Sequence, residues 1–169
     1  ELARALDAPL FASTTSRLLI DLNRSIAHPR LYSEFTRHAP PALRQEILER
    51  HYLRYRDKVE SCIAQMLASG QRVIHISSHS FTPELDGNRR NADIGLLYDP
   101  ARRAESALCA RWKNALRAQM SGLKTRLNYP YRGTADGLTA YLRRRFETDR
   151  YAGIEVEINQ KHVLSGARH

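Results

Sequence analysis

The sequence predicts an α/β protein: a three-layer α/β/α sandwich around a mostly parallel or mixed sheet. Segments with apolar residues at helical spacing alternate along the chain with short β-branched runs, and such alternation favours a sheet covered by helices on both faces. The composition, 42% hydrophobic and 27% charged over 169 residues, is that of one globular domain. We therefore expect residues 1–169 to form a single domain.

The first part of the chain predicts an opening helical turn, a strand, an apolar run and a long helix. The first three are expected over residues 2–6, 8–12 and 18–20. Residues 28–41 carry prolines near both ends, which predicts an irregular loop over a site. The long helix is expected over residues 42–69, because apolar residues recur every three or four positions between Pro41 and Gly70.

The second part predicts strands that alternate with two helices. Polar residues 82–90 read as a loop, and Thr134 is placed to cap the second helix. In the last strand, Glu155 and Glu157 share one side, and apolar residues occupy the other. The strands are expected over residues 73–77, 93–99, 124–128 and 151–158, and the helices over 104–120 and 134–146.

The chain is strongly basic, with a formal charge of +9 and a pI near 10.0. Nucleic acid and acidic small molecules are therefore both conceivable partners. The basic residues are dispersed, however, and the main cluster, Arg143 to Arg145, ends a predicted helix, where cations complement the helix dipole. A solvated basic surface is favoured over a nucleic-acid partner, and the sequence does not indicate an oligomeric state.

Location and completeness are indicated only indirectly. No apolar run reaches a membrane-spanning length. Cys62 and Cys109 have no CxxC partner, which argues against a disulfide framework or thiolate metal site and favours a reducing cytoplasm. The chain begins at Glu1, without an initiator methionine and inside a helical pattern, so we expect a piece of a longer protein.

Polar residues follow several of the predicted strands, where α/β sheets keep their ligand sites. His79 ends an apolar strand, and its imidazole is either a metal ligand or general base, or a hydrogen-bonded structural group. Glu157 is either a general base or acid, or a carboxylate that faces solvent from an edge strand or pairs with an arginine. Arg24 and Arg132 are carboxylate clamps or ordinary surface arginines. Asn23, Asn128 and Tyr131 neighbour these arginines.

Taken in order, five segments resemble the N-formylglutamate amidohydrolase family, whose fold is similar to that of the zinc carboxypeptidases. The resemblance spans essentially the whole chain, and it is the ordered set, not any one member, that is specific. The segments are Ser16-Arg-Leu-Leu-Ile-Asp-Leu-Asn-Arg24, Ser78-His-Ser-Phe81, Arg90-Asn-Ala-Asp-Ile-Gly-Leu-Leu-Tyr98, Asn128-Tyr-Pro-Tyr-Arg-Gly133 and Gly153-Ile-Glu-Val-Glu-Ile-Asn-Gln160.

The resemblance implies hydrolysis of an N-formyl or similar amide of an acidic amino acid, with a zinc cofactor. His79 matches a zinc ligand, and Glu157 matches the carboxylate that activates water and passes its proton to the leaving amine. Arg24, after Asn23, matches a pair that holds the substrate carboxylate and helps to polarise the scissile carbonyl. Arg132, in the turn that holds Asn128 and Tyr131, is a second candidate for anion binding. Asp21 and Asp93 are expected to orient the arginines and strand ends.

Two further zinc ligands of the family precede the Ser16 segment, and no histidine lies upstream of it here. His75 is a possible substitute, although a packed core histidine is the favoured interpretation. Three hypotheses follow: a metal-dependent amidohydrolase, a homologue that binds an acidic small molecule without turnover, and, least favoured, a basic nucleic-acid-binding module.

Overall fold

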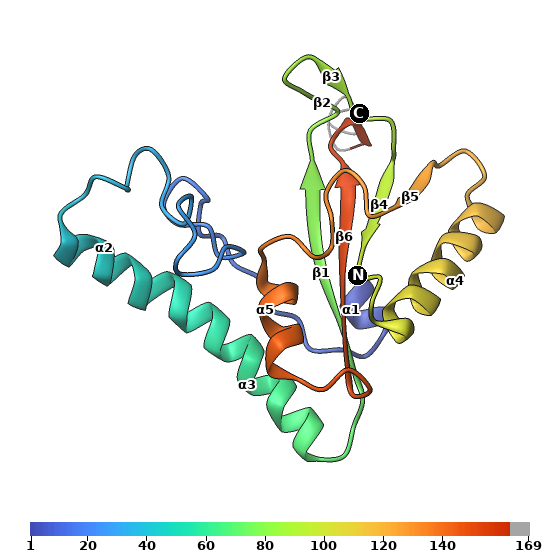
Figure 1. The fold of residues 1–169 in the computed structure, drawn as a ribbon, viewed down its shortest axis with the longest axis horizontal. Helices are drawn as coiled ribbons and strands as arrows, with labels where there is room; N and C mark the ends of the chain where they lie inside the picture. The colour runs from blue at the N-terminus through green and yellow to red at the C-terminus, as the bar shows by residue number, and fades with distance from the viewer. Residues whose placement is uncertain (163–169) are drawn as a thin grey trace. The chain divides into compact units, whose positions relative to one another are not determined.

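A computed structural model describes residues 1–162 of the protein, drawn in Figure 1. The chain divides into two compact units, one of residues 1–69 and a second that begins at Gly70. Each unit is described by itself below. Within residues 1–162, no helix is both long and apolar enough to cross a membrane.

The first unit consists of loops and one long helical segment. After α1 (Leu2–Ala5), α2 (Pro41–Ile47), a π-helical stretch (Leu48–Leu53) and α3 (Arg54–Ala68) follow one another without a break, as the spacing predicts for residues 42–69. The prediction of a strand over residues 8–12 is wrong. Leu10 is 74% exposed, and residues 8–12 form no strand. A strand needs a partner and a covered apolar face. The core of this unit is formed by Ile20, Leu31, Ile47 and Tyr52.

The second unit is built on a four-stranded mixed sheet with the order β1-β6-β4-β5. The two long strands, β1 (Val73–Phe81) and β6 (Tyr151–Asn159), are parallel neighbours. The short strands β4 (Ile94–Leu97) and β5 (Thr125–Leu127) are parallel to each other, and β4 is antiparallel to β6. Because β1 continues to Phe81, beyond the predicted end at residue 77, His79 lies inside a strand and its side chain has a defined face.

Helices cover both faces of this sheet, as expected for an α/β/α sandwich. On one face, Cys109 of α4 (Arg103–Gln119) packs with Leu96 and Ile154 in a buried cluster. On the opposite face, Thr139 of α5 (Leu138–Arg145) donates a hydrogen bond to Glu155, the neighbour of Ile154 in β6.

Two local expectations in this unit are wrong. Helix α5 begins at Leu138 after Gly137, so Thr134 does not cap it. The predicted loop over residues 82–90 contains a small hairpin of β2 (Glu84–Leu85) and β3 (Asn88–Arg89). Its turn residues Asp86 and Gly87 have φ of 50° and 74°, the left-handed conformation that a type I′ hairpin turn requires at both positions.

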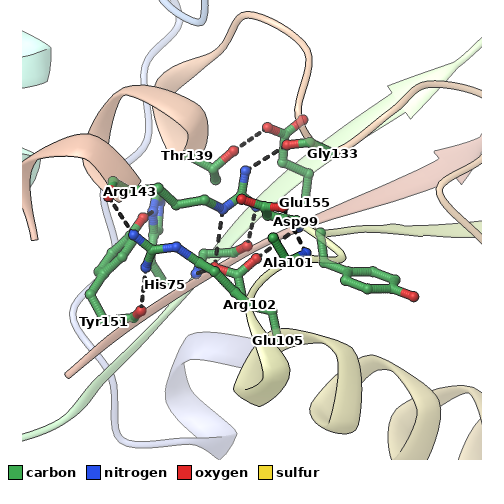
Figure 2. Close-up of polar contacts among 12 residues, drawn as sticks. His75, Asp99, Ala101, Arg102, Glu105, Gly133, Thr139, Arg143, Tyr151 and Glu155 are labelled. Atoms are coloured by element: carbon green, nitrogen blue, oxygen red, sulfur yellow. Dashed lines mark hydrogen bonds and ion pairs between the residues drawn. The ribbon is translucent and has the colours of Figure 1, made fainter. Parts of the chain in front are cut away.

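A buried ion pair completes the sheet where β4 stops (Figure 2). Arg143 Nε donates to Glu105 Oε1 at 3.0 Å, while its two terminal nitrogens each donate at 2.5 Å to the carbonyls of Gly133 and Gly153. Glu105 also accepts hydrogen bonds from the backbone N–H groups of Gly153 and Asp99. These side chains satisfy the backbone of β6 at Gly153, a residue beyond the pairing range of β4.

Arg143 therefore does not belong to a solvated basic cluster, as its sequence context predicted. It is 7% exposed, whereas Arg144 and Arg145 are exposed. The prediction was wrong because a run of arginines does not reveal that the first of them faces a buried glutamate on another helix. Only the structure brings Glu105 within reach.

Candidate functional site

His79 and Glu157 lie side by side on adjacent strands of the second unit. In the parallel register of β1 and β6 they are direct partners, so both side chains project from the same face of the sheet. Glu157 is 5% exposed, and β6 is hydrogen-bonded to strands on both sides. The interpretation of Glu157 as a residue facing solvent from an edge strand is therefore wrong.

The His79 ring is half-buried and has a neighbour on its own strand. Its Nε2 lies 2.9 Å from the hydroxyl of Ser77, two residues earlier and on the same face. The ring can donate or accept in this hydrogen bond, depending on which nitrogen carries the proton. The imidazole is thus oriented beside Glu157 by a local polar contact.

The segment after β5 covers the sheet next to Glu157. In Figure 1 this segment, drawn in orange, crosses β6 and β1 on its way to α5. It passes over Gly95, the partner of Glu157 in β4. A Cβ atom on Gly95 would lie 1.9 Å from the carbonyl oxygen of Tyr129, so only glycine permits this approach. The chain path of residues 128–133 therefore brings that segment to the His79–Glu157 face.

Within that segment, Asn128 and Tyr131 have different surroundings. Asn128 has φ of 47°, and its side-chain oxygen accepts hydrogen bonds from the N–H groups of Tyr98 and Gly133, each at 3.0 Å. This oxygen organises the turn. Tyr131 is 42% exposed, and its hydroxyl accepts a hydrogen bond from Arg90 at 3.0 Å. Arg132 is exposed.

Arg90 was not among the candidate residues chosen from the sequence. It belongs to one of the five segments that carry the family resemblance, but its side chain had no assigned role. The available signal was the pair of tyrosines in Asn128-Tyr-Pro-Tyr-Arg-Gly133, which could stack on an arginine. Nothing in the sequence indicates which arginine does so.

Asn23 and Arg24 belong to a loop of the first unit, and side chains of the π-helical stretch and of α3 hold this loop by hydrogen bonds. Asp21 Oδ1 accepts the Asn23 N–H at 3.0 Å, and Oδ2 of the same carboxylate lies 3.8 Å from Arg24 Nε. The Tyr52 hydroxyl donates to the Arg24 carbonyl at 2.7 Å, and Arg56 donates to the Leu22 carbonyl at 3.3 Å. The Arg24 side chain is 32% exposed, so its backbone is fixed while its guanidinium keeps access to solvent.

Asp93 joins the end of β6 to the start of β4. Its carboxylate lies 2.6 Å from Lys161 Nζ and 2.7 Å from His162 Nε2, and it accepts the Lys124 N–H at 2.7 Å. Burial alone would raise the pKa of Asp93, but the hydrogen bonds from Lys161, Lys124 and His162 outweigh it and lower the pKa from 3.8 to about 2. Asp93 thus stabilises strand ends.

This shift predicts how the stability of the protein depends on Asp93 and pH. The folded-state pKa lies below the unfolded value, so the contribution of Asp93 is present above about pH 4 and is lost as the pH falls toward 2. We expect Asp93→Asn to lower the free energy of unfolding by about 1–3 kcal/mol at pH 7. In urea titrations the difference from wild type should shrink between pH 4 and pH 2. A difference that is constant with pH would contradict the assignment.

His75 has the surroundings of a packed histidine. Its Nδ1 lies 2.9 Å from the Tyr151 hydroxyl, and Figure 2 shows the two rings close together. Burial, with the nearby charges of Arg143 and His79, lowers the pKa of His75 to about 4, so the ring is neutral at pH 7. Its Nδ1 is engaged by Tyr151, which agrees with the favoured interpretation from the sequence.

The described residues do not fit a zinc site. Within residues 1–162, no group of three or more histidine, cysteine, aspartate or glutamate side chains is arranged to hold a metal ion. Protein zinc sites use at least three such ligands, and the register of β1 and β6 supplies Glu157 as the direct partner of His79. Cys62 and Cys109 are both free thiols. Of the ligands that a zinc site needs, His79 is therefore the one for which the sequence makes a prediction.

Comparisons with known proteins agree with the resemblance seen in the sequence. The chain is similar to a gene product of Agrobacterium tumefaciens of known crystal structure, with 30% identity and a TM-score of 0.68. The similarity covers 86% of this chain and 58% of that one, so this chain spans little more than half the length of that relative. No curated protein matches. A family model described as N-formylglutamate amidohydrolase matches residues 1–164, and the chain therefore belongs to the N-formylglutamate amidohydrolase family.

Proposed function

We propose that this chain is a hydrolase that cleaves the N-formyl, or a similar N-acyl, amide of an acidic amino acid such as N-formylglutamate. Family membership supports the reaction class. The observation that carries the proposal is the pairing of His79 with Glu157 on adjacent parallel strands, with Glu157 only 5% exposed. A carboxylate removed from bulk water beside an imidazole is suited to moving a proton at a reacting centre.

In the proposed reaction, Glu157 is the general base. Its carboxylate takes a proton from a water molecule as the water oxygen bonds to the formyl carbon. The same proton then passes from Glu157 to the amide nitrogen, and the carbon–nitrogen bond breaks. Formic acid, which gives up its proton to the free amine and becomes formate, leaves with the amino acid. Proton transfer of this kind contributes roughly 10²–10⁴-fold to enzymatic rates.

Arginines are the proposed contacts for the substrate carboxylates. In the first unit, the partly exposed Arg24, with Asn23, is proposed to bind a carboxylate, because a guanidinium donates two parallel hydrogen bonds to such a group. Tyr131 and Arg132 are exposed and are proposed to contact the substrate directly. Asn128 is proposed to act through the shape of its turn, since its side-chain oxygen already accepts two backbone hydrogen bonds.

Zinc is the metal that the family resemblance implies, with His79 as one ligand. Since the described residues do not complete a site, no step of the mechanism is assigned to a metal. A cytoplasmic location is also part of the proposal, supported by the two free cysteines.

A second candidate function is binding of an acidic small molecule without turnover. It is favoured by the contact between His79 Nε2 and the Ser77 hydroxyl, because this nitrogen is already engaged by a neighbour. The partly exposed Arg24 would be retained for an anion in such a protein.

We expect purified protein to release glutamate from N-formylglutamate, and His79→Ala to lower this rate by at least roughly 10²-fold. Elemental analysis of both proteins tests the zinc prediction, because zinc bound through His79 would be present in the wild type and reduced in the variant. Ser80→Ala is the matched control, because the exposed Ser80 follows His79 but projects from the other face. Binding of N-formylglutamate by calorimetry without product release would support the second candidate.

A further inference from the structure

Arg90 is a half-buried cation held between two aromatic rings. Its guanidinium carbon lies 5.9 Å from the centre of the Phe81 ring and 5.1 Å from that of Tyr131. One terminal nitrogen donates to the Tyr131 hydroxyl at 3.0 Å and lies 3.5 Å from the Thr82 hydroxyl. Among the described residues, no carboxylate lies within ion-pairing distance of it. The side chain is oriented by rings and hydroxyls, and no carboxylate of residues 1–162 neutralises its charge.

The position of Arg90 follows from its two aromatic neighbours. Phe81 lies two residues after His79 in β1, so both side chains project from the same face, about 7 Å apart along the strand. Tyr131 belongs to the segment that passes over Gly95, the partner of Glu157. Both neighbours therefore place the guanidinium at the carboxyl end of β1 and β6, on the His79–Glu157 face.

We propose that Arg90 binds a carboxylate of the substrate and so determines specificity for acidic amino acids, an inference that rests on the proposed function. A flexible arginine loses conformational entropy when a ligand orders it. The Arg90 side chain is already ordered by Phe81 and Tyr131, so binding costs it less entropy. A guanidinium that pairs with no carboxylate within residues 1–162 is available to a carboxylate from outside. Arg132, in contrast, is exposed on the same turn. Arg90, rather than Arg132, is therefore the principal anion-binding arginine of this unit.

The test measures kcat/KM of the wild type and of Arg90→Gln on three substrates. N-formylglutamate carries two carboxylates, whereas N-formylglutamine and N-formylisoglutamine each carry one, on opposite ends of the molecule. Arg90→Gln is expected to lower kcat/KM for N-formylglutamate by roughly 10–100-fold, mostly through KM, because a charge-assisted hydrogen bond is lost. The same loss is expected for the monoamide that keeps the bound carboxylate. The other monoamide should be cleaved at the wild-type rate.

Two more variants distinguish a binding role of Arg90 from a purely structural one. Arg126→Gln is the control, because Arg126 also stacks on a tyrosine of this turn, 4.0 Å from the Tyr129 ring centre, and has no role in the proposal. Arg126→Gln should leave kcat/KM for each of the three substrates within roughly twofold of the wild-type value. Tyr131→Phe removes the hydroxyl that accepts from Arg90 and should reproduce the selectivity change at reduced size, roughly 3–10-fold.

An equal loss on all three substrates for Arg90→Gln would overturn the proposal, because a merely structural role does not distinguish the carboxylates. If wild type cleaves none of them, the proposed function fails, and the Arg90 proposal is then decided by calorimetry with the same compounds. A selective loss of binding in Arg90→Gln would still support it. Unchanged affinities would contradict it.

Discussion

Glu157→Gln is expected to lower kcat for hydrolysis of N-formylglutamate by roughly 10²–10⁴-fold while KM changes little. The substitution keeps the size of the side chain and removes its ability to accept a proton from water. The residue is 5% exposed and lies in a strand paired on both sides, so the surrounding sheet holds its side chain in place in the variant. Steady-state kinetics with a coupled assay for glutamate measures the effect.

Glu155→Gln is the matched control for Glu157→Gln. Glu155 lies two residues earlier in β6, on the same face, and is 8% exposed. Its Oε1 accepts a hydrogen bond from Thr139, which a glutamine oxygen can also accept. We expect kcat to stay within roughly threefold of wild type. Equal losses of kcat in both variants would contradict the assignment of Glu157 as the base, because removal of either buried charge on β6 would then lower the rate to the same extent.

Arg143→Ala is expected to lower the free energy of unfolding by about 3–5 kcal/mol, because it leaves the Glu105 carboxylate buried without its cation. Glu105 is completely buried and Arg143 is 7% exposed. The substitution also removes the hydrogen bonds to the carbonyls of Gly133 and Gly153. Urea unfolding, followed by the fluorescence of Trp112 in α4, measures the loss in the second unit.

Arg144→Ala is the control for that experiment. Arg144 follows Arg143 in α5 but is exposed, so its loss should cost less than about 0.5 kcal/mol. The pair Glu105→Leu with Arg143→Met removes both charges and should cost less than the sum of the single changes. Additive losses would mean that the two side chains do not act as a pair.

The sequence predicts most of the elements because their patterns depend on local properties. The long helix over residues 42–69 and the last strand, with Glu155 and Glu157 on one side, follow from apolar spacing alone. The strand expected over residues 8–12 had a suitable composition, but a strand needs a partner and a covered face. Whether a segment finds these depends on the rest of the chain, which is why this prediction failed.

The candidate site is predictable only in part. His79 could be selected because it follows an apolar strand, and Glu157 because a carboxylate inside a β-pattern is unusual. Their register as direct partners requires the sheet. The roles of Asn128 and Arg90 depend on contacts across the fold, to Tyr98 for one and to Phe81 and Tyr131 for the other. The prediction for Arg143 failed for a related reason. A run of arginines is typical of an exposed surface, and the sequence does not indicate that Arg143 pairs with the buried Glu105.

The central claim, that this chain hydrolyses N-formyl amides, is tested most directly by a proton NMR time course of N-formylglutamate with the wild-type protein. We predict that the formyl resonance of the substrate declines while formate and glutamate appear in equal amounts, far in excess of the protein present. An intact substrate throughout the time course, with saturation transfer showing that it binds, would contradict the claim and establish the chain as a binding protein.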